Sequence, residues 1–187
     1  MNTRLLGTLG MIGGLAYVVM AGFSAIVPIS FTDFNFPAQL LHIVWAAGAI
    51  CGWLGFIAIR GTGQNIAVRF LSFLPIVGLS LILVAAVYAL INRFAPYSVP
   101  LGGVGIALEL IGIVLNTIFA IATRALTGWR KFAPLFVLCS VVLGGLIMGL
   151  TNGSVLGLPL CLGFAYAILG YAVLSAEPAT KLIRQPA

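Results

Sequence analysis

Charged residues are scarce in this sequence. Only 6% of its 187 residues are Asp, Glu, Lys or Arg, whereas soluble domains average about 25%. The surface of a water-soluble protein cannot be built from so few charges, so lipid must be the solvent for most of the exterior. The mean hydropathy of +1.22 agrees with this reading. The composition therefore predicts an integral membrane protein.

Histidine and cysteine are also rare. One histidine is too few for a haem held by two histidines of this chain or for a His-rich metal site. Cys51, Cys139 and Cys161 lie inside apolar runs without a Cys-x-x-Cys motif, so we expect free thiols that behave as small buried hydrophobes. No Gly-x-Ser-x-Gly, Walker or His-Glu-x-x-His motif occurs. We therefore expect no catalytic residue, no metal and no cofactor.

What the sequence has in abundance is apolar runs long enough to cross a bilayer, which takes about 20 helical residues. Six such runs are separated by turn residues, for example Gly61-Thr62-Gly63-Gln64. The alternation typical of barrel strands is absent, so the fold class we expect is an all-α six-transmembrane-helix bundle forming one domain over residues 1–187. The first run imitates a signal peptide, but its length favours a retained helix. The helices are expected at about 6–27, 39–59, 70–91, 102–123, 132–150 and 156–175.

The lysines and arginines predict the orientation of the bundle. Eight of the nine fall at the termini or in the loops after the second and fourth helices, and only Arg93 falls in a loop on the other side. Basic residues are enriched on the cytoplasmic side, so both termini are expected in the cytoplasm. The charges are dispersed rather than gathered in a patch, so nucleic acid is not an expected partner.

Two patterns concern helix packing. Arg4, Arg69 and Arg130 each precede an outward-going helix, which suggests three helical-hairpin repeats, although any six-helix protein with basic inner loops shows this pattern. Gly48-x-x-x-Gly52 has the spacing that lets helix backbones approach closely. We expect these glycines to serve packing within the chain rather than a dimer interface.

Glu109 is the strongest candidate for a functional residue. The sequence has three acids, of which Asp33 falls in the first outer loop and Glu177 in the C-terminal tail. Glu109 falls inside the fourth helix, roughly 10 Å from its outer end. An ionisable residue in a span is costly to bury and is a functional hypothesis by default. The alternative is a structural role, in which a neutral Glu109 hydrogen-bonds a neighbouring helix. Either role places it in the bundle interior.

Other polar residues fall at a similar depth and could join Glu109 in an outward-facing cluster. Asn116 shares a helix face with Glu109. The histidine by itself is more typical of an interfacial, hydrogen-bonded residue than of a ligand. The candidate ligand-binding residues are Glu109, His42, Arg93, Asn116, Asp33 and Gln39.

One loop carries a resemblance to known proteins. The segment Gly128-Trp129-Arg130-Lys131-Phe132-Ala133-Pro134, followed by two apolar helices, resembles the inner loop of uncharacterised six-span integral membrane proteins of bacteria. The resemblance covers this motif and the general layout of the chain. It implies a bacterial inner membrane but no activity. Size and layout are also similar to the substrate-binding components of energy-coupling-factor vitamin transporters, although the sequence has no substrate-loop signature of that family.

These observations leave three functions open. The first is binding or transport of a small molecule or lipid through a cavity near Glu109. The second is a non-catalytic structural or assembly subunit, whose partner would be another membrane protein. The third and least favoured is an intramembrane enzyme. A cavity reaching Glu109 favours the first, an outward face of small residues the second, and a cluster of Asp33, His42 and Glu109 the third.

Overall fold

Within the residues that the computed structural model describes (2–26, 35–63, 65–93, 100–123, 126–151 and 156–176), every regular element is a helix. Six of the helical segments are long and apolar enough to cross a membrane, which confirms the predicted multi-pass architecture. Their ends lie within a few residues of the expected positions. The long helices are α1 (Thr3–Ile26), α2 (Phe36–Ala58), α4 (Leu74–Asn92), α5 (Pro100–Thr123), α6 (Ala133–Leu150) and α7 (Gly157–Leu174).

The third span differs from the expected single helix because it is broken near one end. A short helix, α3 (Ile66–Leu71), precedes α4, and the backbone turns at Ser72 and Phe73. Pro75 explains the break, because it has no N–H to donate to the carbonyl of Leu71 and its ring crowds that carbonyl. The fifth span likewise begins with a short 3-10 helix, η2 (Gly128–Phe132), ahead of Pro134 in α6.

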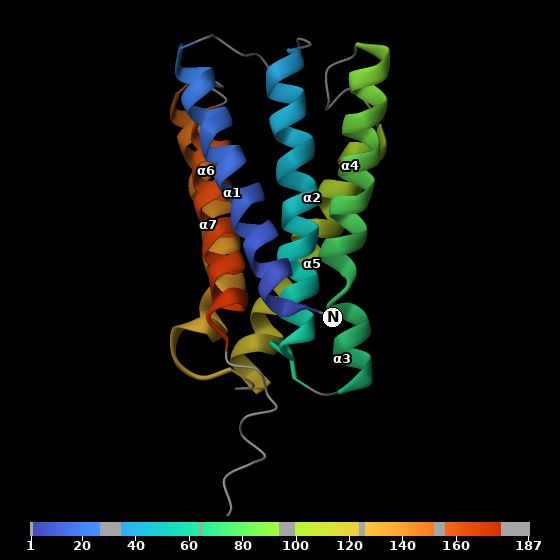
Figure 1. Ribbon diagram of the computed structural model, residues 1–187, viewed down its shortest axis with the longest axis vertical. Coiled ribbons are helices and arrows are strands. Elements are labelled where there is room, and N and C mark those ends of the chain that lie inside the picture. Colours follow the sequence, from blue (N-terminus) through green and yellow to red (C-terminus); the bar gives the residue numbers. More distant parts are fainter. Residues whose placement is uncertain are drawn as a thin grey trace, which may run out of the picture.

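The long helices form a bundle in which consecutive members run in opposite directions (Figure 1). Helix α1 packs on α2 and α7, α4 packs on α5, and α6 packs on α7, while α2 also contacts both α4 and α7. The contact between α5 and α6 is less extensive than that between α4 and α5. The most extensive contact joins α1 and α7, which are far apart in the sequence. The three-hairpin repeat therefore remains a prediction.

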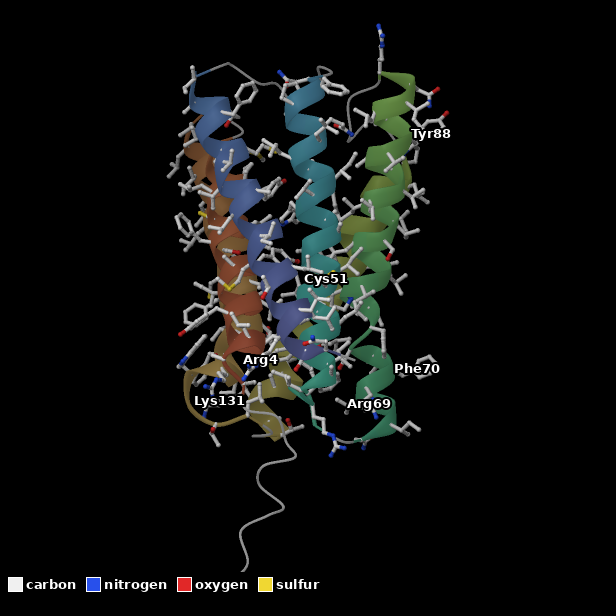
Figure 2. The ribbon with its side chains drawn as sticks, viewed as in Figure 1. Arg4, Cys51, Arg69, Phe70, Tyr88 and Lys131 are labelled. Carbon is white, nitrogen blue, oxygen red and sulfur yellow. The ribbon has the colours of Figure 1, made fainter. Side chains whose placement is uncertain are left out.

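The basic residues gather at one end of the bundle. Arg4, Arg69 and Lys131 all lie at the lower end in Figure 2, where Arg60 also follows α2. Arg93 follows α4 at the opposite end. We call the two ends the basic end and the opposite end. The basic loops thus lie at the same end of the bundle, and their location in the cytoplasm remains a prediction.

Glycines allow the backbones of several helices to touch. A Cβ added to Gly13 would lie 2.6 Å from the Cα of Gly48, and one added to Gly14 would lie 2.4 Å from the backbone nitrogen of Ala167. Real Cβ atoms do not approach so closely, so only glycine fits these positions of α1. The expectation that Gly48 serves packing within the chain is confirmed.

The outer surface of the bundle is apolar, as contact with lipid requires. Exposed side chains such as Leu146 and Val84 cover it, and Tyr88 points outward in Figure 2. The three cysteines are free thiols. Cys51 and Cys161 are partly buried, but Cys139 is exposed on α6, so the expectation that all three are buried is wrong for that residue.

The orientation can be tested with single cysteines in a variant whose native cysteines are replaced by alanine. Thr151 at the opposite end and Thr127 at the basic end are both exposed, whereas Thr62 is buried and would be shielded on either side. A membrane-impermeant maleimide added to intact cells should modify a cysteine at Thr151. It should modify one at Thr127 only after permeabilisation. The reverse pattern would place the termini outside.

The glycine contacts can be tested within one helix. Gly14→Ala should lower the free energy of unfolding by roughly 1–3 kcal/mol, because the added methyl overpacks the contact with α7. Gly22→Ala is the matched control, since a Cβ there meets nothing within 4 Å, and it should be neutral or slightly stabilising. Reversible unfolding in mixed detergent measures both. Equal effects of the two substitutions would contradict the proposed role of Gly14.

Candidate functional site

A partly open cavity of about 100 Å³ lies inside the bundle, where all six spans meet. Its wall is mostly apolar, with Glu109 and His42 as its carboxyl and imidazole groups. Glu109 lies about 14 Å along α5 from Pro100, near the middle of that span rather than close to its end. The wall residues are Tyr17 of α1, His42 and Trp45 of α2, Ile82 of α4, Ile106, Glu109 and Leu110 of α5, Val141 of α6, and Leu158 and Leu162 of α7.

Glu109 faces the interior, as expected, with 7% of its surface exposed. The hydroxyl of Tyr166 in α7 donates a hydrogen bond to its Oε1 at 2.5 Å. The indole N–H of Trp53 in α2 in turn donates to the Tyr166 hydroxyl oxygen at 3.4 Å. Three buried side chains on three helices thus form a continuous polar chain through the core.

The backbone of α4 fixes the position of Glu109. A Cβ added to Gly78 would lie 2.5 Å from the backbone nitrogen of Glu109 and 2.5 Å from the carbonyl oxygen of Gly105. Helix α4 therefore lies directly against α5 at this depth. Glu109 shares the buried face of α5 with Gly105, Gly112 and Asn116. This contact holds the carboxyl group at the cavity rather than toward lipid.

Aromatic rings form one side of the cavity. Tyr17 and Trp45 stack with ring centroids 4.4 Å apart and planes 13° apart. The ring of His42 lies 5.7 Å from that of Tyr17 and 5.1 Å from that of Trp45. Tyr166 meets Trp45 edge to face at 5.7 Å. Four rings from α1, α2 and α7 are therefore packed on one another beside the cavity, and three of them, Tyr17, His42 and Trp45, line it.

The predicted six-residue cluster is only partly assembled. Gln39 is buried, but its amide donates to the carbonyl of Ala86 at 2.7 Å and so joins α2 to α4. Asn116 donates to the carbonyl of Gly112 at 2.8 Å and to that of Ser72 at 3.4 Å, near the break between α3 and α4. Neither residue lines the cavity. These two bonds indicate helix-packing roles.

Arg93 and Asp33 complete the predicted set. Arg93 is exposed after α4 in a left-handed conformation (φ = 57°), and it does not line the cavity. Asp33 lies outside the described residues. Of the predicted set, the structure brings Glu109 and His42 together at the cavity.

Sequence reasoning missed Tyr17, Trp45 and Tyr166. Aromatic residues are common in spans, and nothing local distinguishes these three from lipid-facing ones. The position of Tyr166 along its helix could have identified it as a partner of Glu109. Tyr166 lies nine residues after Gly157, where α7 begins, and Glu109 lies nine residues after Pro100, where α5 begins. Both helices start at the same end, so the two side chains lie at the same level.

A second hollow lies on the outer surface between α6 and α7. It is larger, about 470 Å³, but it is a shallow groove. Trp129 and Tyr171 stack along it with ring centroids 5.9 Å apart. Its lining carries no acid, base or amide, and it faces lipid. The smaller cavity is therefore the better candidate site, because it alone of these two combines enclosure with a carboxyl group.

The hydrogen bond of Glu109 predicts how substitutions behave. Glu109→Gln should unfold at a temperature close to that of the original chain, because the amide oxygen still accepts from Tyr166. Glu109→Leu should lose roughly 1–3 kcal/mol, because the Tyr166 hydroxyl loses its acceptor. Adding Tyr166→Phe to Glu109→Leu removes the unpaired hydroxyl but leaves the indole N–H of Trp53 without its acceptor, so the double variant should recover little of that loss. Thermal unfolding in detergent compares the four proteins, and equal stability of the Gln and Leu variants would contradict the structural role.

Comparison of the chain with protein-family models, with curated proteins and with solved structures finds no match. The case for a function therefore rests on the chemistry of the cavity.

Proposed function

We propose that this multi-pass membrane protein binds a small molecule or a lipid group in the cavity beside Glu109. The observation that carries the proposal is a partly open, mostly apolar space inside the bundle with a carboxyl group in its wall. Ligand sites combine an apolar lining with a few placed polar groups, and a perturbed or costly polar group marks such a site. The proposed function is binding, and transport across the bilayer would require this binding as its first step.

An empty cavity of this size would destabilise the folded protein. By the relation between cavity volume and stability, about 100 Å³ of void lowers stability by roughly 2 kcal/mol. A 150 Å³ apolar cavity accommodates benzene, and one water occupies about 30 Å³. The cavity therefore fits a compact group of about four to five heavy atoms. A ligand of that size would fill the empty space and could interact with the carboxyl group of Glu109.

The location is part of the same proposal. The basic residues at one end of the bundle support termini that face the cytoplasm. The resemblance of the Gly128–Pro134 loop supports the inner membrane of a bacterium. With this orientation the cavity would lie nearer the external side, since His42 falls in the first two turns of α2 at the opposite end.

The two alternative functions have less support. An assembly subunit would present small residues outward, and Gly145 and Gly149 are exposed on α6, where an added Cβ would meet nothing within 4 Å. The glycines of α1, by contrast, are largely occupied inside the bundle. An intramembrane enzyme would need a third group beside His42 and Glu109. The cavity therefore favours binding over both.

Filling the cavity tests the proposal. Val141 lines it, whereas its neighbour Val142 is 57% exposed. Native mass spectrometry of protein purified in mild detergent should detect a bound small molecule or lipid, and Val141→Phe should lose it because the larger ring occupies the space. Val142→Phe is the matched control and should retain it. Retention by Val141→Phe, with both variants folded, would contradict binding in this cavity.

A further inference from the structure

The charge and shape of the cavity restrict its ligand to one chemical class. We infer that the cavity binds a small alkylammonium cation, held by the carboxylate of Glu109 and by the aromatic wall. The inference rests on the proposed binding function and names the class of ligand.

Charge gives the first argument. The carboxyl group of Glu109 lines the cavity, and no lysine or arginine of the described residues does. Arg4, Arg69 and Lys131 lie at the basic end of the bundle (Figure 2), and Arg93 follows α4 at the opposite end. An anion would face the carboxyl group without any compensating charge, and a neutral ligand would leave the carboxylate without a countercharge. A cation resolves both problems, because buried charges are stable only when paired.

The hydrogen bonds give the second argument. Oε1 of Glu109 accepts from Tyr166, and within the described part of the chain no hydrogen bond engages Oε2. The Tyr166 bond thus fixes the carboxyl plane and leaves one oxygen for a donor inside the cavity. A protonated amine can donate an N–H there in a charge-assisted hydrogen bond, which is about twice as strong as a neutral one.

The aromatic wall gives the third argument. Aromatic rings attract cations through the negative charge on their faces, tryptophan most strongly, and rings grouped around a site are a common way to bind alkylated ammonium groups. Tyr17 and Trp45 stand in the wall beside Glu109. The alkyl groups of the same ligand would contact the apolar side chains across the cavity, including Ile82 and Val141. One small amine therefore satisfies every kind of group in the lining.

Binding of this kind is linked to protons. The titratable groups around the cavity are Tyr17 of α1, His42 of α2, Glu109 of α5 and Tyr166 of α7, while α4 and α6 contribute Ile82 and Val141. Glu109 is the acid among them. A cation and a proton neutralise the same carboxylate, so they compete. Acidification should weaken binding of the cation and leave binding of a neutral molecule of the same shape unchanged.

Three ligands that share a tert-butyl group and differ in charge test the inference. They are tert-butylammonium, tert-butanol and trimethylacetate, each measured by calorimetry on the whole protein in nanodiscs of zwitterionic lipid. The cation and the alcohol have the same shape, so the comparison between these two is the decisive one, whereas the carboxylate is larger by two heavy atoms. The original chain should bind the cation at least about tenfold more tightly than the alcohol, which is the gain expected from one charge-assisted hydrogen bond. The carboxylate should bind most weakly. The preference for the cation should shrink as the pH is lowered.

Two variants identify the groups responsible. Glu109→Gln keeps the shape of the side chain but removes its charge, so the ratio between the affinities for cation and alcohol should fall to the severalfold preference that the aromatic wall alone provides. Trp45→Leu should reduce that ratio severalfold, because it removes the ring but leaves the carboxylate. Val142→Phe on the exposed surface should leave the ratio unchanged.

The outcomes separate the two proposals. Equal binding of cation and alcohol to the original chain, or an undiminished cation preference in Glu109→Gln, would overturn the inference while leaving the cavity as a binding site. Failure of all three ligands to bind, together with no difference between the Val141→Phe and Val142→Phe proteins in retained ligand, would overturn the proposed function as well.

Discussion

Direct contact between glycine backbones holds this bundle together. In lipid there is no hydrophobic force between helices, so close packing must supply the attraction. Gly13 and Gly14 bring α1 against α2 and α7, and Gly78 and Gly105 bring α4 against α5. These contacts fix two tight groups of helices, and α5 meets α6 less extensively. The cavity lies where the groups meet, and it persists because backbones locked on both sides cannot move inward to fill it.

The chain from Trp53 through Tyr166 to Glu109 crosses between the same groups. It links α2 and α7 of the first group to α5 of the second. A carboxyl group in a span is costly, and this chain lowers the cost by giving it one strong donor. The arrangement also orients the carboxyl group, since the donor engages only Oε1. Packing and chemistry at the cavity thus depend on one another.

The sequence predicted features that depend on one helix at a time. Hydropathy located the six spans, and helix rise placed Glu109 inside its span. Features that depend on pairs of helices were not predictable. Tyr166 became the partner of Glu109 only once the bundle placed α7 where its side chain reaches that of α5, and Pro75 broke a span that hydropathy alone reads as continuous. Asn116 shows the limit most clearly: it shares the face of Glu109, but seven residues of helix separate the two by about 10 Å, so it serves a different contact.

The presence of the carboxyl group in the cavity is the feature that packing alone does not account for. A leucine at position 109 with a phenylalanine at position 166 could fill the same space, at the cost of the acceptor that Tyr166 offers to the indole N–H of Trp53. The glycine contacts hold α4 against α5 and α1 against α2 and α7, and they would do so with either side chain at position 109. A carboxyl group that is costly in lipid and lies in the wall of a partly open space is best explained by something that enters that space.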